Sequence, residues 1–346
     1  MRPIANRSRV APANALIVSP ANPEPVQLGT REVAELLGVH SSTVKRWFRG
    51  VRGSGASGAV RPEPASAGAR VGTTAGGHRR IPLDTALRVA RERGNEVYLH
   101  WFGDDAGAVW TAVQALEGGN ASPARDLLVG WLKLGRAHLI GRFLRHVTAV
   151  DPIEARILDG VLGGFLRRVG EGWRRGELRI ADERAATREV SETIISLVGG
   201  TGYVRRRQGP EPPVAVVGTL ENDHHGLGAL LVRLMLVQRG WAVEYLGTGL
   251  PIPEIVAAQR ARGAVLVCLS VTPPSSAADA HRFIEVAREL ADPRRPFALA
   301  VGGSGGRRAG AAVRAWPLGR SGRFASLSAF QRWMDRHFPR TASVPA

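Results

Sequence analysis

Between residues 212 and 340, short apolar runs alternate with segments that have the pattern of amphipathic helices. The runs predict short buried strands at Val214–Val217, Trp241–Leu246, Ala264–Leu269 and Phe297–Val301. A helix is predicted from Leu230 to Gln238, where Gly240 stops it, and Pro253 suits the first turn of a helix that continues to about Arg262. This alternation predicts a parallel sheet with helices on both faces.

Ligands of parallel sheets bind beyond the carboxyl ends of the strands, so the loops after the strands are the places to inspect. These loops are Thr219–Leu227, Ser270–Ser275 and Gly302–Gly306. The first leads into an Asp-x-His-x-x-Gly pattern formed by Asp223, His225 and Gly228. The other two contribute hydroxyl groups and small residues, namely Ser270, Thr272, Gly302 and Gly303.

These residue types suit a transition-metal cofactor. A neutral imidazole is a good cobalt ligand. A nearby carboxylate, here Asp223, can accept the other ring N–H, fix the tautomer and raise the basicity of the ligating nitrogen. Glycines at Gly228, Gly302 and Gly303 allow close approach of a bulky ligand. His224 competes with His225 as the metal ligand, but no glycine follows it three residues later, so the pattern favours His225.

Residues 104–200 are rich in helical patterns. Apolar side chains recur at helical spacing in two places, at Leu127, Leu128, Trp131 and Leu132 and again at Val161, Leu162, Phe165, Leu166 and Val169. Breaks such as Gly118–Asn120 and Asp151–Pro152 mark short connections. Several helices joined by short loops predict a helical bundle.

Residues 26–95 contain two short helical patterns. Thr30 can cap a helix that runs to about Leu37, Gly38 and Val39 form a turn, and Ser41 can cap a second helix. Val44 and Trp47 of the second helix are predicted to face inward, and its outward residues are Ser42, Thr43, Lys45, Arg46 and Arg49. A helix-turn-helix with a basic second helix suits the major groove of DNA, where hydroxyls and guanidinium groups meet phosphates and base edges.

The charge of the chain also favours a nucleic-acid partner. The net charge is +17, and between residues 45 and 80 we count eight basic residues and one acidic residue, Glu63. This favours a polyanionic partner. A second explanation stays open, because arginine far outnumbers lysine and the composition is that of a GC-rich genome. A single cysteine, Cys268, excludes an intramolecular disulfide and a multi-cysteine metal site.

A Gly76-Gly77 turn followed by His78, Arg79 and Arg80 comes after the second helix. Together the two elements resemble the MerR/excisionase-type winged helix-turn-helix, which implies that these three residues help to grip the DNA backbone. The alternative is a basic surface on a small helical domain. The stretch from about Gly50 to Val71 is longer and richer in Gly, Ala and Ser than that family pattern.

The last segment resembles the Rossmann/flavodoxin-like cobalamin-binding domain of methionine synthase, corrinoid methyltransferase carriers and some mutases. The resemblance rests on Asp223, His225 and Gly228 and on the later loops. It implies that His225 replaces the dimethylbenzimidazole of cobalamin as lower cobalt ligand (base-off/His-on) and that Asp223 supports it. It also implies that the nucleotide tail passes Ser270, Thr272, Gly302 and Gly303.

The stretch upstream resembles the four-helix cap of the same proteins, and the whole resembles cobalamin-dependent MerR-family regulators of the CarH type, which sense light through adenosylcobalamin. The resemblance implies that Trp173 packs against the adenosyl group and that Glu183 accepts its ribose hydroxyls, although Trp173 also suits ordinary bundle core. The family has histidines where this chain has Arg174 and Arg184. Arginine cannot ligate cobalt, which puts a light-driven upper-face histidine adduct in doubt.

The sequence therefore predicts a tail over residues 1–25, a MerR-type winged helix-turn-helix over 26–95, a four-helix cap over 104–200 and a cobalamin-binding α/β domain over 212–340. We expect a cytoplasmic, homo-oligomeric DNA-binding regulator rather than an enzyme. No run of about 18 apolar residues predicts a membrane span. Two alternatives stay open: a corrinoid methyl carrier, and a regulator that no longer uses cobalamin and senses through protein partners.

Overall fold

The computed structural model describes residues 26–49, 72–73, 78–148, 155–204, 211–272, 277–305 and 310–339. The chain divides into two compact units, Met1–His100 and Trp101–Ala346. The predicted tail 1–25, the stretch Gly50–Val71 and the Gly76-Gly77 turn lie outside the described residues. Among the described residues, no helix combines the length and the apolar character needed to cross a bilayer.

The first unit combines short helices with a small antiparallel sheet. Its elements are β1 (Gln27–Leu28), α1 (Thr30–Leu37), α2 (Ser41–Trp47), β2 (Gly72–Thr73), β3 (Arg79–Pro82) and α3 (Leu83–Glu92). The strands pair in the order β1-β3-β2. A further helical segment, η2 (Tyr98–Asp105), follows α3.

The caps of α1 and α2 differ from the prediction. Thr30 lies inside α1, whose N-cap is Gly29, and the Glu32 carboxylate accepts the Gly29 N–H at 2.6 Å. The N-cap of α2 is His40 rather than Ser41, and its Nδ1 atom accepts the Ser42 N–H at 3.3 Å. A histidine nitrogen therefore caps this helix in place of the predicted serine hydroxyl.

The turn between α1 and α2 lies where it was predicted, at Gly38, whose φ of 61° is the left-handed conformation that glycine adopts most readily. The inward face of α2 differs in one residue. Val44 is fully buried as expected, but the buried aromatic residue is Phe48, and Trp47 is partly exposed. Phe48 follows Val44 by four residues, so it shares the same helical face more closely than Trp47 does.

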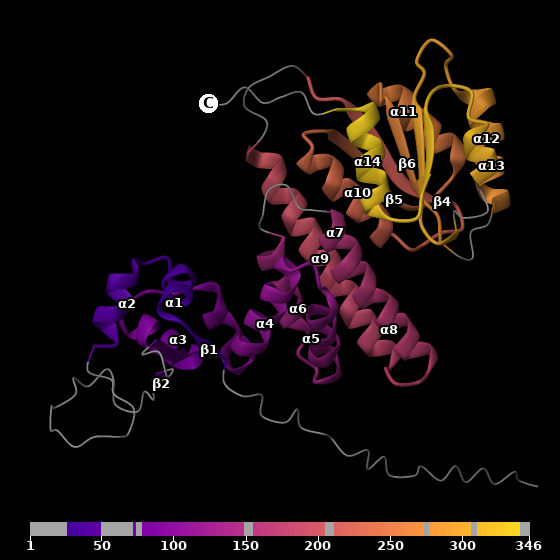
Figure 1. Ribbon diagram of the computed structural model, residues 1–346. Coiled ribbons are helices and arrows are strands. Elements are labelled where there is room, and N and C mark those ends of the chain that lie inside the picture. Colours follow the sequence, from indigo (N-terminus) through magenta and orange to yellow (C-terminus); the bar gives the residue numbers. More distant parts are fainter. Residues whose placement is uncertain are drawn as a thin grey trace, which may run out of the picture. The chain divides into compact units, whose positions relative to one another are not determined.

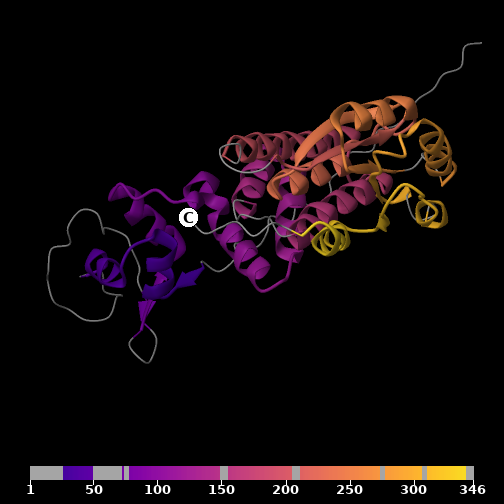
Figure 2. The same cartoon turned by 90° about the horizontal axis from the view of Figure 1, so that it is seen from above.

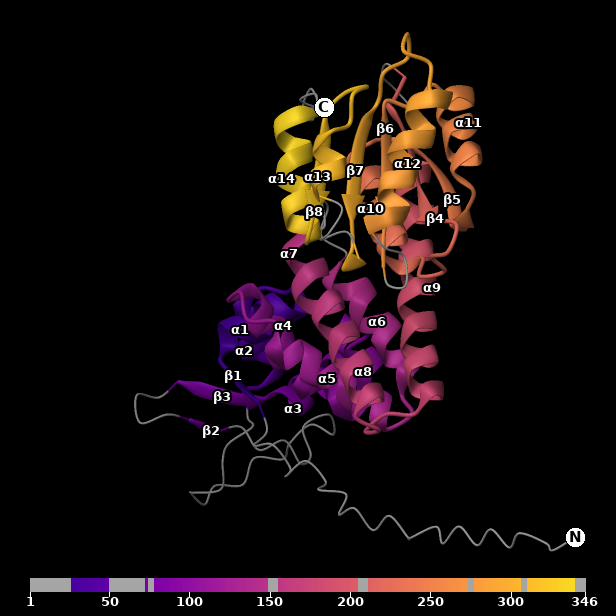
Figure 3. The ribbon, with the colours of Figure 1, turned by 90° about the vertical axis from the view of Figure 1, so that its right-hand side faces the viewer.

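The second unit begins with a helical bundle. Its helices are α4 (Ala106–Glu117), α5 (Ser122–Lys133), α6 (Ala137–Val147), α7 (Ala155–Ile157), η3 (Leu158–Gly163), α8 (Gly164–Arg174) and α9 (Ile180–Val204). α8 and α9 run side by side (Figures 1 and 3). Trp131 forms part of the buried core, where Phe102 stacks on it with ring centroids 5.8 Å apart.

The rest of the second unit is a parallel sheet flanked by helices. Its elements are β4 (Val214–Leu220), α10 (Leu227–Gln238), β5 (Ala242–Leu250), α11 (Ile252–Arg262), β6 (Leu266–Ser270), α12 (Ala277–Leu290), β7 (Ala298–Gly302), α13 (Gly310–Arg314), β8 (Ser321–Phe324) and α14 (Leu327–His337). The strand order is β5-β4-β6-β7-β8, and every pairing is parallel. The predicted parallel α/β sheet is therefore confirmed, with β8 added beyond the four predicted strands.

Helices cover both faces of this sheet (Figures 1 and 2). On one face, Val216 of β4 belongs to a buried cluster with Ile255 of α11, Phe283 of α12 and Trp316 after α13. Its neighbour Val217 points to the opposite face, which α10 and α14 cover. The carboxyl ends of β4, β6 and β7 lie together at one edge, because the strands are adjacent and parallel.

Candidate functional site

Asp223 lies at the centre of the candidate site, in the loop that follows β4. Its side chain is completely buried, and its carboxylate accepts three hydrogen bonds from backbone and hydroxyl donors. The Thr272 N–H donates at 2.6 Å, the Thr272 hydroxyl at 2.6 Å and the His225 N–H at 3.0 Å. A buried carboxylate needs such partners, and these fix its position between the ends of β4 and β6.

The ring of His225 lies against the same carboxylate. Its Nδ1 atom is 3.2 Å from the Oδ1 atom of Asp223, and 63% of the histidine side chain is exposed. With Nδ1 turned to the carboxylate, Nε2 is the ring nitrogen that a ligand can reach. This is the arrangement in which a carboxylate orients a metal-binding imidazole.

His224 is also exposed, but its ring lies elsewhere. A Cβ atom built on Gly249 of β5 would come within 3.1 Å of the Cε1 atom and 3.2 Å of the Nδ1 atom of His224. Gly249 has a φ of 71°, so a glycine suits this position on both grounds. The His224 ring therefore packs against the backbone of β5, and His225 is the histidine that faces Asp223.

Gly228 and Ser270 form a close contact between α10 and the end of β6. A Cβ atom at position 228 would lie 2.5 Å from the Ser270 Oγ atom, and Ser270 is buried. The absence of a side chain at Gly228 thus lets α10 approach the hydroxyl of Ser270. The sequence suggested that a glycine here gives access to a bulky ligand. The structure adds a second reason, which is close packing of α10 against Ser270.

A cavity of about 250 Å³ lies next to this contact, on the face of the sheet covered by α10 and α14. Gly228, Ser270, Gly302 and Gly303 all line it, so the structure brings together four of the residues singled out in the sequence. Most of its other walls are apolar and include Val217, Leu231, Leu269, Phe324 and Phe330. The cavity thus lies beside the first turn of α10, directly after the loop that carries Asp223 and His225, and those two residues are not part of its lining.

Cys268 also lines the cavity, from within β6. The residue is buried, and burial raises the pKa of its thiol far above the usual range. The group is therefore a neutral thiol that behaves as a small apolar side chain.

Trp173 and Glu183 flank the turn between α8 and α9, and neither lines the cavity beside Gly228. Trp173 is 48% exposed, so the alternative of a core tryptophan does not hold. The Glu183 carboxylate accepts the Thr187 hydroxyl at 3.0 Å. Arg174 donates to the carbonyl of Gly170 at 3.3 Å, and the Arg184 side chain is exposed.

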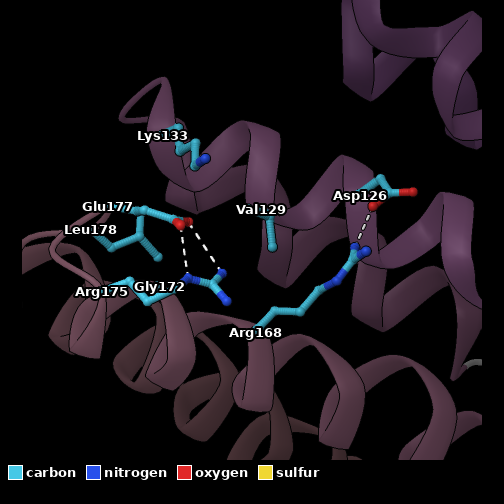
Figure 4. A pocket seen from close by; sticks show the side chains of 8 residues that line it. All are labelled: Asp126, Val129, Lys133, Arg168, Gly172, Arg175, Glu177 and Leu178. Atoms are coloured by element: carbon cyan, nitrogen blue, oxygen red, sulfur yellow. Dashed lines mark hydrogen bonds and ion pairs between the residues drawn. The ribbon is translucent and has the colours of Figure 1, made fainter.

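A second hollow lies beside this turn, lined from α5, α8 and the residues after Trp173 (Figure 4). Its charges are largely paired within the wall. Arg175 donates to Glu177 at 2.7 Å, which lowers the pKa of Glu177, and Arg168 pairs with Asp126. These pairs make it a polar surface hollow rather than an apolar binding cavity.

The basic residues predicted to meet DNA lie on α2 and β3. Ser42, Lys45, Arg46, Arg49, His78 and Arg80 are exposed, whereas Thr43 and Arg79 are partly buried. The Arg79 guanidinium donates to the backbone carbonyl of Lys45 at 3.4 Å. This bond connects β3 with α2, a link across 34 residues that the sequence pattern did not indicate.

The α/β part of the chain matches a family model of known proteins. The family model for the B12 binding domain matches residues 213–314, which include the Asp223–His225 loop and the residues from β6 and β7. This match supports cobalamin binding by the C-terminal part of the chain, as the sequence predicted.

The individual relatives include regulators. The chain is 30% identical over 133 residues to the HTH-type transcriptional repressor CarH of Myxococcus xanthus, which covers 38% of this chain and 42% of that protein. It is 27% identical over 204 residues to the HTH-type transcriptional repressor CarA of the same organism, covering 57% of each chain. The resemblance to the CarH-type regulators is confirmed at this modest identity.

Corrinoid proteins also match. Trimethylamine corrinoid protein 1 of Methanosarcina mazei is 32% identical over 109 residues, 32% of this chain and 49% of that one. The chain thus spans about half the length, or somewhat less, of the CarH repressor and of the trimethylamine corrinoid protein. The structure of the Methanosarcina barkeri monomethylamine corrinoid protein aligns over 61% of this chain and 94% of that chain, at 17% identity and a TM-score of 0.47.

Proposed function

We propose that this chain is a DNA-binding transcriptional regulator that binds cobalamin through His225, and that DNA binding or self-assembly responds to the bound cofactor. The observation that carries the proposal is the pairing of an exposed imidazole, His225, with a fully buried carboxylate, Asp223; Gly228, three residues further on, lines an apolar cavity. The match of residues 213–314 to the B12 binding domain supports it.

In this proposal His225 offers Nε2 to cobalt in the base-off/His-on mode, and Asp223 holds the imidazole through Nδ1. Thr272 holds Asp223, and Gly228, Ser270, Gly302 and Gly303 border the space for the nucleotide tail. Bound cobalamin supplies a cobalt ion whose upper ligand can change. His225 and Asp223 would hold the cobalt, and the apolar walls of the cavity would surround the tail.

As upper ligand we propose adenosyl, which the resemblance to CarH-type regulators implies. The exposed ring of Trp173 offers an apolar face, and the carboxylate of Glu183 offers an acceptor for ribose hydroxyls. Arg174 and Arg184 carry protonated guanidinium groups, which cannot ligate cobalt. A light response in this chain would therefore not use a histidine from either of these two positions.

DNA binding is assigned to the first unit. The exposed Lys45, Arg46 and Arg49 make α2 suitable for the major groove, with His78 and Arg80 of the adjacent strand region directed to phosphates. The hydrogen bond from Arg79 to Lys45 holds the two elements together. Winged regulators of this kind bind paired half-sites, so we expect a homo-oligomer.

A corrinoid methyl carrier is the second candidate, and similarity to a trimethylamine corrinoid protein favours it. The sheet and bundle suit both functions. The first unit argues for the regulator, because a carrier has no use for the basic face of α2 and β3. A regulator that has lost its corrinoid is a third candidate, suggested by Arg174 and Arg184.

The test starts from a random-sequence DNA duplex pool, from which the full-length protein selects its binding sites. A gel-shift assay and a size measurement then compare the protein without cofactor, with adenosylcobalamin in the dark, and after illumination. We expect cofactor to change DNA affinity or size, because it must bind one state better than another. Selection of no DNA, or no response to cofactor or light, would contradict the proposal. An excess of unselected random-sequence duplex as competitor controls for non-specific binding.

A further inference from the structure

The bundle segment next to the cavity contains a short π-helix, η3, between α7 and α8. π-helical turns leave backbone groups out of register, and here Arg125 of α5 compensates by donating to the Gly160 carbonyl at 3.2 Å. Arg125 lies so close to α8 that a Cβ atom on Gly164 would come within 2.5 Å of its Cδ atom. Glycine at 164 and arginine at 125 thus hold η3 in place.

Asp159 extends from η3 to the first turn of α14, a helix that lies beside α7 (Figures 1 and 3). Its carboxylate accepts the backbone N–H groups of Leu327 at 2.9 Å and Ser328 at 2.8 Å, and the Ser328 hydroxyl at 2.6 Å. These two N–H groups have no partner within α14, because they belong to its first turn. A residue of the bundle therefore caps a helix of the sheet domain, 168 residues away.

The rest of the α14 N-terminus is satisfied locally. The Ser326 hydroxyl accepts the N–H of Ala329 at 3.1 Å. Toward the other end of the helix, Asp335 pairs at 2.6 Å with the buried side chain of Arg239, the residue that follows α10. α14 is therefore capped locally at its N-terminus and paired with Arg239 near its C-terminus. Asp159 and Ala155 of the bundle contact it as well, and the N–H of Ala155 donates to the Oε1 atom of Gln331 at 3.3 Å.

The contact made by Asp159 lies on the wall of the cavity. Leu158, Asp159 and Gly163 line it from the bundle, while Ser326, Leu327 and Phe330 line it from α14 and the residue before it. The hydrogen bonds of Asp159 therefore join two walls of the same cavity. The other wall residues are mostly apolar, so a group larger than this cavity can enter only if the two walls separate.

We infer that Asp159 is a positioning residue that holds η3 against α14 and keeps the cavity closed, so that opening the cavity and separating η3 from α14 are one event. The inference deepens the proposed function, because a cofactor tail that enters here would act on the position of η3. Asp159 is then one contact through which a ligand in the sheet domain acts on the helical bundle.

Cys268 gives a readout that needs no cobalamin. It is the only cysteine of the chain, it lines the cavity, and burial keeps it a neutral thiol. Its reaction with a thiol reagent such as iodoacetamide therefore reports the population of an open cavity. The full-length apoprotein is used, and circular dichroism checks that each variant remains folded.

Asp159→Asn loses the charge and one acceptor oxygen while keeping the size of the side chain. We expect Cys268 to react about tenfold faster in this variant, because charge-assisted caps contribute to closing the cavity. Asp126→Asn is the matched control, since it removes a bundle carboxylate that pairs with Arg168 outside this cavity (Figure 4). Its rate should equal that of the unmodified protein.

Equal Cys268 rates in the unmodified protein, Asp159→Asn and Asp126→Asn would overturn the inference. If Asp159→Asn does not fold, Ser328→Ala makes the same comparison, because it removes only the hydroxyl donor, and a rate unchanged from that of the unmodified protein would again overturn it. The outcome does not depend on cobalamin binding. Failure of the proposed function would show instead as no protection of Cys268 by added adenosylcobalamin.

Discussion

The Nδ1 atom of His225 lies 3.2 Å from the Oδ1 atom of Asp223, and of the two side chains only the histidine is exposed. The hydroxyl of Thr272 donates to the same oxygen and the Thr272 N–H donates to Oδ2, so both carboxylate oxygens are held. The pair therefore joins a rigid, buried acceptor to an accessible nitrogen, which is the arrangement that a protein-supplied metal ligand requires.

Replacing Asp223 with asparagine tests this arrangement. The amide can no longer accept from all of the groups that now donate to Asp223, and it places an N–H₂ group against at least one donor. We expect the affinity for cobalamin to fall by about 10- to 100-fold. Titration of the apoprotein with hydroxocobalamin, followed by absorbance, measures it. Thr272→Ser, which keeps the hydroxyl, is the control, and equal affinities for all three proteins would refute the role of Asp223.

Gly228→Ala tests the contact between α10 and β6. The new methyl group would lie 2.5 Å from the Ser270 Oγ atom, so the helix or the strand end must move. We expect the free energy of unfolding to fall by about 1–3 kcal/mol. In Gly228→Ala/Ser270→Ala the nearest remaining Ser270 atom is Cβ at 3.5 Å, an ordinary contact, so urea unfolding should show recovery of most of the loss. If the double variant recovers no free energy of unfolding, the contact with the Ser270 hydroxyl is not the source of the strain.

The pH dependence of stability includes a contribution from His146 of α6. Burial lowers its pKa below the ordinary value of 6.5, so the folded protein binds a proton there less readily than the unfolded chain. Stability from this group is present above pH 6.5 and is lost as the pH falls through 6.5 toward the folded-state pKa. Urea unfolding at about pH 7.5 and about pH 5.5 should show a smaller loss for His146→Gln than for the unmodified protein. A loss of the same size would count against this assignment.

Arg46→Ala tests the DNA-binding face. If Arg46 contacts one phosphate, the variant should bind selected duplexes more weakly, and the slope of log affinity against log salt should become shallower by about 0.9. Arg88→Ala removes an exposed arginine of α3 that pairs with Glu92, and is the control. Fluorescence anisotropy over a salt series measures both slopes. Identical slopes for Arg46→Ala and the unmodified protein would exclude a phosphate contact by Arg46.

The sequence predicted the sheet well where strands are apolar and continuous. β4, β6 and β7 lie within a few residues of the predicted runs, because buried parallel strands carry unbroken hydrophobic residues. The Ser321–Phe324 strand β8 was missed, since Ser-Gly-Arg-Phe has neither an apolar run nor regular alternation. Its place at the edge of the sheet, next to β7, comes from tertiary pairing.

The sequence named most residues of the candidate site, but it did not show which of them contact one another. Asp223 and Thr272 lie 49 residues apart, and only the parallel register of β4 and β6 brings them together. Asp159 carried no signal, because its partners are backbone N–H groups of a helix in another part of the chain. Trp173 was compatible with a core position by spacing alone, and only the structure shows that its ring is exposed.

The central claim is that His225, and not its neighbour His224, is the cobalt ligand. The most direct measurement is the absorption spectrum of full-length protein that is mixed with adenosylcobalamin in the dark and then desalted. We predict that the unmodified protein and His224→Ala keep the cofactor with the same base-off/His-on spectrum, whereas His225→Ala loses the colour or shows a changed spectrum. Retention by His225→Ala of the cofactor with the spectrum of the unmodified protein would contradict the account.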